Sequence, residues 1–140
     1  MPSYFDTSVV LSLVVGDVRA DRAFELWSSE LERVSSVLTE IECVTVLRRL
    51  SAGWSSTAVR AAQARLDSAL EEMALKPLDE EIVEKLRAAS ELTGCRNLDA
   101  AHLATALYFQ TAADSNLTIC TFDARMAEAA ARVGLTCASI

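Results

Sequence analysis

Short β-prone apolar segments alternate along the whole chain with longer stretches in which apolar residues recur every three or four positions. The short segments cover residues 3–5, 34–38, 75–78, 117–122 and 135–138. The helical stretches begin at 7 or 8, 19, 40, 55 or 56, 79, 98 and 123 or 124, and end near 15, 31, 50, 73, 92, 110 and 133. Parallel strands need helix-length crossovers, so this alternation predicts an α/β fold. We expect a three-layer α/β/α sandwich around a central, mainly parallel sheet of four or five strands.

The length of 140 residues fits one domain spanning residues 1–140, large enough to fold without disulfides or structural zinc. The longest apolar span, Val9 to Val15, is broken by Ser12 and is far shorter than the about 20 residues of a membrane helix. The N-terminus lacks the basic and apolar regions of an export signal, so we expect a cytoplasmic protein without a membrane partner.

Several classes of chemistry are disfavoured by composition. The four cysteines form no C-x-x-C pair, which argues against a zinc ribbon or a thioredoxin-type site, so we expect them to be reduced and mostly buried. His102 is the only histidine, which excludes a metal site with two histidines. The net charge of −7 gives no general attraction to nucleic acid, so any such contact must be local or bridged by metal.

Four acidic residues follow apolar runs or lie near the start of helical patterns: Asp6, Glu42, Asp99 and Asp123. In an open α/β sheet, the loops beyond the carboxyl ends of the strands share one crevice, so these carboxylates can converge. Clustered carboxylates repel one another unless a cation joins them, and oxygen ligands favour Mg²⁺, with Mn²⁺ as a possible substitute. Such ions commonly serve phosphoryl transfer or phosphodiester hydrolysis.

Each carboxylate also has an ordinary explanation, because acidic residues cap helix N-termini and complement the helix dipole. This explanation is weakest for Asp6, which lies between Phe5 and a pair of valines where an apolar residue would stabilise the fold more. For Asp99 and Asp123, capping or dipole compensation serves equally well.

Glu42 competes with Glu40 for the crevice. The two lie roughly 200° apart on a helix, so only one can face the site, and the apolar period alone does not decide between them.

The acidic residues belong to four short segments: Tyr4-Phe-Asp6-Thr-Ser8; Ser36-x-Leu-x-x-x-Glu42 followed by Leu47-Arg-Arg49; Leu98-Asp99-Ala-Ala-His102-Leu-Ala-Thr-Ala; and Thr121-Phe-Asp123-x-Arg-Met-x-x-Ala-Ala with Gly134. In this order and at these separations, the segments resemble the PIN-domain ribonucleases and, within them, the VapC-type toxins of bacterial toxin-antitoxin pairs. The resemblance covers essentially the whole chain.

The resemblance implies roles for particular residues. Glu42, and not Glu40, falls on the acidic motif position. Asp6 and Asp99 would be the principal metal ligands, and Glu42 and Asp123 would complete the acidic catalytic cluster directly or through water. Ser8 would support the cluster by hydrogen bonding.

Other implications concern the substrate and the partners. The expected activity is Mg²⁺-dependent hydrolysis of RNA, with either Glu42 or Asp123 accepting the proton of the attacking water. Arg49 could contact an RNA phosphate, and so could Arg96 and Arg125, although each could equally be a solvated charge. For His102 we expect packing or a hydrogen bond near Asp99. A cognate VapB-type antitoxin and a homodimer are further family expectations.

Two other functions are compatible with parts of the pattern. An inactive PIN-like module would only bind a partner, but four retained carboxylates would then repel one another without a metal. A phosphatase of the haloacid dehalogenase kind also has an aspartate after its first strand, but it needs a second aspartate where this chain has Ser8.

Overall fold

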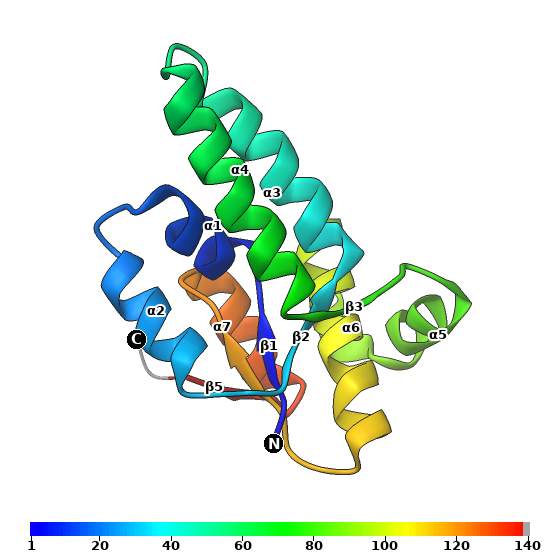
Figure 1. The fold of residues 1–140 in the computed structure, drawn as a ribbon. Coiled ribbons are helices and arrows are strands. Elements are labelled where there is room, and N and C mark those ends of the chain that lie inside the picture. Colours follow the sequence, from blue (N-terminus) through cyan, green and yellow to red (C-terminus); the bar gives the residue numbers. More distant parts are fainter. Residues whose placement is uncertain (139–140) are drawn as a thin grey trace.

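A computed structural model describes residues 1–138 as a five-stranded, wholly parallel sheet in the order β3-β2-β1-β4-β5 (Figure 1). The strands are β1 (Ser3–Phe5), β2 (Arg33–Ser36), β3 (Ala74–Lys76), β4 (Thr118–Cys120) and β5 (Thr136–Cys137). The helices are α1 (Thr7–Val15), α2 (Ala20–Ser28), α3 (Val37–Leu50), α4 (Ser56–Glu71), α5 (Glu80–Ala88), α6 (Asn97–Ala113) and α7 (Ala124–Arg132), with a 3₁₀ turn at Ser90–Leu92. The predicted α/β fold is confirmed.

The central strand β1 divides the core into two clusters, because its successive side chains point to opposite faces of the sheet. Phe5 packs into the cluster formed with α1, α2, α3 and α4, where its ring contacts Trp27 edge to face. Tyr4 packs on the opposite face with residues of α6 and α7, including Leu103 and Met126. Both side chains of β1 are fully buried, so the residue after them is held at the centre of the molecule.

Four predicted helix starts differ from the structure: α2 and α5 begin one residue later than predicted, α6 begins one residue earlier, and α3 begins three residues earlier. α3 begins at Val37 and not at 40 because the Ser36 hydroxyl accepts the backbone N–H of Leu38 at 3.0 Å, and Thr39, the residue before the predicted start, lies buried within the helix. α6 begins at Asn97, and Arg96 takes the cap position without a side-chain cap hydrogen bond.

Within the part of the chain that the structure describes, none of the helices combines the length and apolar character needed to cross a bilayer. Of the two tryptophans, Trp27 belongs to the core and Trp54 is 38% exposed beyond the end of α3.

All four cysteines are free, and two of them are predicted to be unreactive in the folded protein. Burial raises the pKa of the Cys43 and Cys120 thiols to about 12. Because the thiolate is the reactive form, we expect iodoacetamide to label half-buried Cys95 well before Cys43 or Cys120. Peptide mass spectrometry checks this, with urea-unfolded protein as the control in which all four are labelled. Equal labelling rates in the folded protein would contradict it.

Candidate active site

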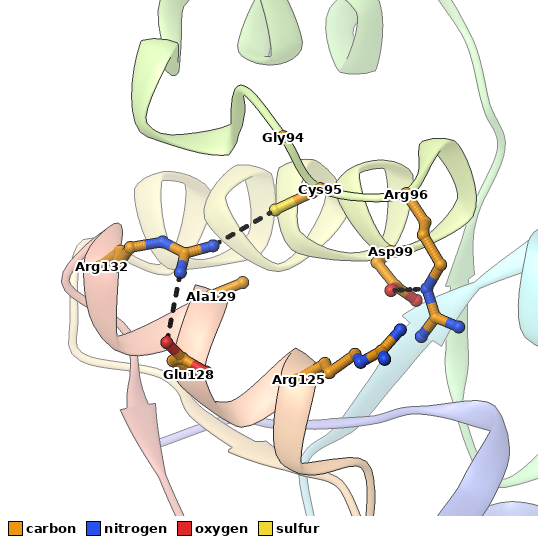
Figure 2. Close-up of a pocket in the computed structure, with 8 residues that line it drawn as sticks. All are labelled: Gly94, Cys95, Arg96, Asp99, Arg125, Glu128, Ala129 and Arg132. Carbon is orange, nitrogen blue, oxygen red and sulfur yellow. Dashed lines mark hydrogen bonds and ion pairs between the residues drawn. The ribbon is translucent and has the colours of Figure 1, made fainter.

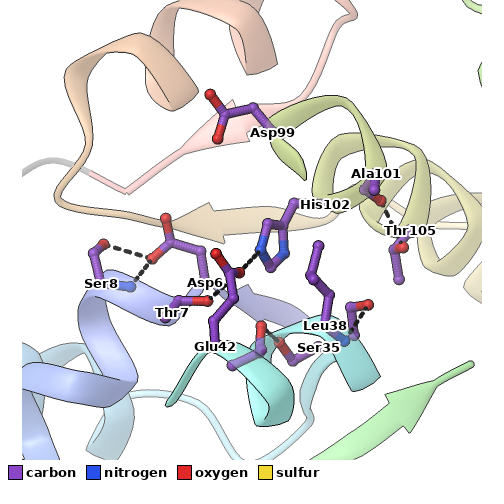
Figure 3. A network of polar contacts seen from close by, with 12 residues as sticks. Asp6, Thr7, Ser8, Ser35, Leu38, Glu42, Asp99, Ala101, His102 and Thr105 are labelled. Atoms are coloured by element: carbon purple, nitrogen blue, oxygen red, sulfur yellow. Dashed lines mark hydrogen bonds and ion pairs between the residues drawn. The ribbon is translucent and has the colours of Figure 1, made fainter. Parts of the chain in front are cut away.

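The structure brings all four predicted acidic residues to one hollow of about 240 Å³ at the carboxyl end of β1. Asp6 enters from the start of α1, Glu42 from α3, Asp99 from the first turn of α6 and Asp123 from the start of α7. Ser8 and His102 also line the hollow, and Figure 3 shows the arrangement without Asp123. Residues more than 110 positions apart therefore meet through the parallel strand order.

Asp6 is 4% exposed and caps the N-terminus of α1. Its Oδ1 accepts the Ser8 hydroxyl at 2.6 Å, the Ser8 N–H at 3.0 Å and the Val9 N–H at 3.3 Å. Its Oδ2 accepts the hydroxyl of Thr121. Burial raises the pKa of Asp6 above its usual value, and the hydrogen bonds from Ser8 and Thr121 partly offset that rise. A carboxylate oxygen has two lone pairs, so Oδ2 keeps one available for a further ligand.

Glu42 is held by two side chains that meet at the same oxygen. Its Oε1 accepts the Thr7 hydroxyl at 2.8 Å and lies 2.7 Å from His102 Nε2. Burial raises the pKa of Glu42, but the hydrogen bonds from His102 and Thr7 outweigh burial and bring the pKa below its usual value. Glu42 is therefore ionised at neutral pH, and the site contains a carboxylate fixed through one oxygen.

His102 links Glu42 to the core. Its Nδ1 lies 2.7 Å from the buried hydroxyl of Tyr4, and the ring is only 3% exposed. A neutral imidazole with its proton on Nε2 satisfies both contacts, because Tyr4 then donates to Nδ1 and Nε2–H donates to Glu42. His102 lines the same hollow as Asp99, consistent with the expectation of packing or hydrogen bonding near Asp99, and its hydrogen-bond partners are Glu42 and Tyr4.

Arg96 bridges the two remaining carboxylates. Its Nε donates to Asp99 Oδ2 at 2.7 Å, and its Nη2 donates to Asp123 Oδ2 at 3.2 Å. The other oxygen of Asp123 caps α7 through the N–H groups of Arg125 and Met126. Capping thus accounts for part of the geometry of Asp6 and Asp123, but it does not account for Glu42, which lies in the second turn of α3.

Sequence reasoning missed this bridging role of Arg96. The available signal was the three-residue spacing of Arg96 and Asp99, which brings a side chain just before the helix close to one in its first turn. Arg49, predicted as a phosphate contact, is exposed on α3 and is not among the residues that line the hollow. Glu40 does not line it either.

The donor set suits a hard cation, because all four acidic side chains offer oxygen. Asp6 keeps a lone pair on Oδ2, and Asp99 uses only Oδ2 in its hydrogen bond with Arg96. Among residues 1–138, however, no group of three histidine, cysteine or acidic side chains lies close enough together to hold one ion. A metal held by three of these side chains would therefore require the carboxylates to move closer together.

Comparisons with known proteins identify the family. The model of the PIN domain family matches residues 3–132, so the chain belongs to the PIN domain family, whose members are generally nucleases and typically use divalent metals. No curated protein matched the sequence.

Two solved structures share the fold. One is a toxin-antitoxin complex from Klebsiella pneumoniae, with 22% identity, a TM-score of 0.64, and coverage of 89% of each chain. The other is PAE2754 from Pyrobaculum aerophilum, with 17% identity, a TM-score of 0.59, and coverage of 98% of this chain and 92% of that one.

Proposed function

We propose that this PIN-domain protein is a VapC-type toxin of a type II toxin-antitoxin system, a metal-dependent endoribonuclease that hydrolyses RNA phosphodiester bonds. The observation that carries the proposal is the convergence of Asp6, Glu42, Asp99 and Asp123 on one hollow in a chain of this family. The similarity of the fold to a chain from a toxin-antitoxin complex supports the biological assignment.

In this proposal, Asp6 and Asp99 hold Mg²⁺ or Mn²⁺. The bound ion would lower the pKa of a water molecule and neutralise charge on the scissile phosphate. Ser8 and Thr121 hold the Asp6 carboxylate in place through hydrogen bonds. Asp123 completes the negative charge of the site.

Glu42 is the candidate general base. Its Oε1 is occupied by Thr7 and His102, so its Oε2 is the oxygen available to accept the proton of an attacking water. Its lowered pKa keeps it in the ionised form that a base requires.

The proposed partners are RNA, a cognate VapB-type antitoxin and a second copy of the chain. The net charge of −7 suits a basic antitoxin segment that covers the acidic hollow. Arg49 remains a predicted phosphate contact at the rim.

The first test is cleavage of total RNA by purified, antitoxin-free protein, with Mg²⁺ or Mn²⁺ and with EDTA. We expect cuts that require the metal, and mapping their ends would identify the RNA class. If RNA stays intact and calorimetry detects no Mn²⁺ binding, the nuclease proposal fails and an inactive, partner-binding PIN domain becomes the better description.

A matched pair of glutamates on α3 tests the site itself. We expect Glu42→Gln to lower the cleavage rate by about 100-fold or more, because general-base catalysis contributes roughly 10²–10⁴-fold. Glu40→Gln makes the same charge change outside the hollow and is expected to leave the rate unchanged. Initial rates on one purified RNA give the comparison. Equal rates in the two variants would remove Glu42 from the mechanism.

A further inference from the structure

A second hollow, of about 280 Å³, adjoins the acidic one (Figure 2). It lies between α7, the first turn of α6 and the segment that precedes α6, and Asp99 lines both hollows. Three arginines line it: Arg96, Arg125 and Arg132. We call this hollow the arginine pocket. In a chain whose net charge is −7, three of the 13 basic residues gather at this one place.

The three guanidinium groups differ in how far they are already neutralised. Arg96 bridges Asp99 and Asp123, as described above. Among the described residues, Arg132 makes only long polar contacts, 3.7 Å to Cys95 Sγ and 3.6 Å to Glu128, and exposed ion pairs of this kind are weak.

Of the three arginines, Arg125 has the fewest polar partners for its side chain. Within residues 1–138 its side chain has no hydrogen bond or ion pair, and Figure 2 shows its guanidinium directed toward Asp99 and Arg96. An arginine whose charge is not yet paired is suited to bind an oxyanion such as a phosphodiester through two of its N–H groups.

We propose that the arginine pocket binds a backbone phosphate of the RNA next to the one held at the acidic hollow, with Arg125 as its donor and Arg132 adding positive charge at the far end of the pocket (Figure 2). The inference rests on the proposed ribonuclease function and adds a binding subsite to it. The shared wall at Asp99 makes the two hollows neighbours, so a strand whose scissile phosphate lies among the carboxylates passes directly to the arginines. Arg96 lines the same pocket, but it is already paired with Asp99 and Asp123 and is not one of the proposed donors.

Binding can be measured apart from cleavage. Fluorescence anisotropy of a labelled, short single-stranded RNA in EDTA reports the affinity of the full chain. We expect Arg125→Ala to weaken binding about tenfold, and the double variant Arg125→Ala/Arg132→Ala to weaken it further. The slope of log affinity against log salt should fall by about 0.7 for each phosphate that the variant no longer neutralises. Arg125→Lys keeps the charge and should keep most of that slope.

Two further variants separate a specific pocket from general charge effects. Arg60→Ala removes one exposed charge from α4, away from the pocket, and is expected to leave the affinity within about twofold of the parent. Glu128→Gln removes the carboxylate that faces Arg132 and should tighten binding severalfold. A folding defect would weaken binding, so the tightening cannot be attributed to one.

The outcomes distinguish this inference from the proposed function. If metal-dependent cleavage occurs but the arginine variants bind RNA like the parent, the pocket inference is overturned and the nuclease assignment stands. If the parent binds RNA through the arginines but never cleaves it, the nuclease assignment fails and the phosphate site remains. If the parent does not bind RNA, the pocket inference is overturned, and an acidic protein segment becomes the occupant to test.

Discussion

Asp6→Asn is expected to abolish metal-dependent RNA cleavage while leaving the metal-free protein at least as stable as the parent. The asparagine lacks the negative charge that is proposed to hold the cation. The cleavage rate should fall by more than about 100-fold, because changing even a residue that only hydrogen-bonds to a metal ligand costs about 10–100-fold. Manganese calorimetry should show a matching loss of affinity. A variant that cleaves RNA at the parental rate would exclude Asp6 as a metal ligand.

The stability prediction follows from burial of the Asp6 carboxylate. The fold raises the pKa of Asp6, mainly through desolvation, so the charged form is less favourable in the folded than in the unfolded chain. At neutral pH the asparagine therefore removes the free-energy cost of burying a charged carboxylate. As the pH falls through the raised pKa toward the ordinary value of 3.8, the folded parent binds its proton first and the advantage of the variant disappears.

Thermal unfolding in EDTA at neutral and mildly acidic pH checks this prediction. Asp67→Asn, at an exposed position of α4, is the control for a simple change in net charge. A clear loss of stability in Asp6→Asn at neutral pH would mean that the ionised cap of α1 outweighs the cost of burial.

His102→Leu is expected to lower the free energy of unfolding by about 2–3 kcal/mol, because it removes both hydrogen bonds of a buried ring and leaves their partners poorly satisfied. Leucine fills a similar volume, so the effect of a cavity is kept small. Urea unfolding measures the change. A loss below about 0.5 kcal/mol would show that the Tyr4 and Glu42 contacts are not stabilising.

A double-mutant cycle with Tyr4→Phe isolates the inner hydrogen bond. Each single variant removes the same hydrogen bond between Tyr4 and His102, so the double variant should cost less than the sum of the two. Loss of His102 should also raise the pKa of Glu42, because the hydrogen bond from His102 lowers it. In any remaining activity, the acid limb of the pH-rate profile would then move to higher pH.

The sheet and the convergence of the carboxylates were predictable because both depend on local patterns. Asp6 follows a strand of apolar residues, and parallel strands present their carboxyl ends at one edge. Helix starts were less predictable where two capping residues compete, as Ser36 and Thr39 do before α3. The structure favours Ser36 because its hydroxyl reaches the N–H of Leu38.

The pairing of side chains within the site was not predictable, because it depends on which helices meet across the sheet. Arg96 reaches Asp123, 27 positions away, and His102 reaches Glu42, 60 positions away. From clustered carboxylates alone, one would expect Asp99→Asn to raise stability by relieving repulsion. In the structure Arg96 already pairs with Asp99, so that gain is not expected, whereas the gain from Asp6→Asn rests on burial of the carboxylate.

The strand order also has a consequence during protein synthesis. β1 is made early, but its two neighbours are β2 and β4, and β4 comes more than 110 residues after β1. Thr121, which holds the second oxygen of Asp6, follows β4 directly, and Asp123 follows it in turn. A growing chain that has not reached these residues lacks both a strand beside β1 and the fourth carboxylate. The proposed ribonuclease site is therefore incomplete until nearly all of this chain has been translated.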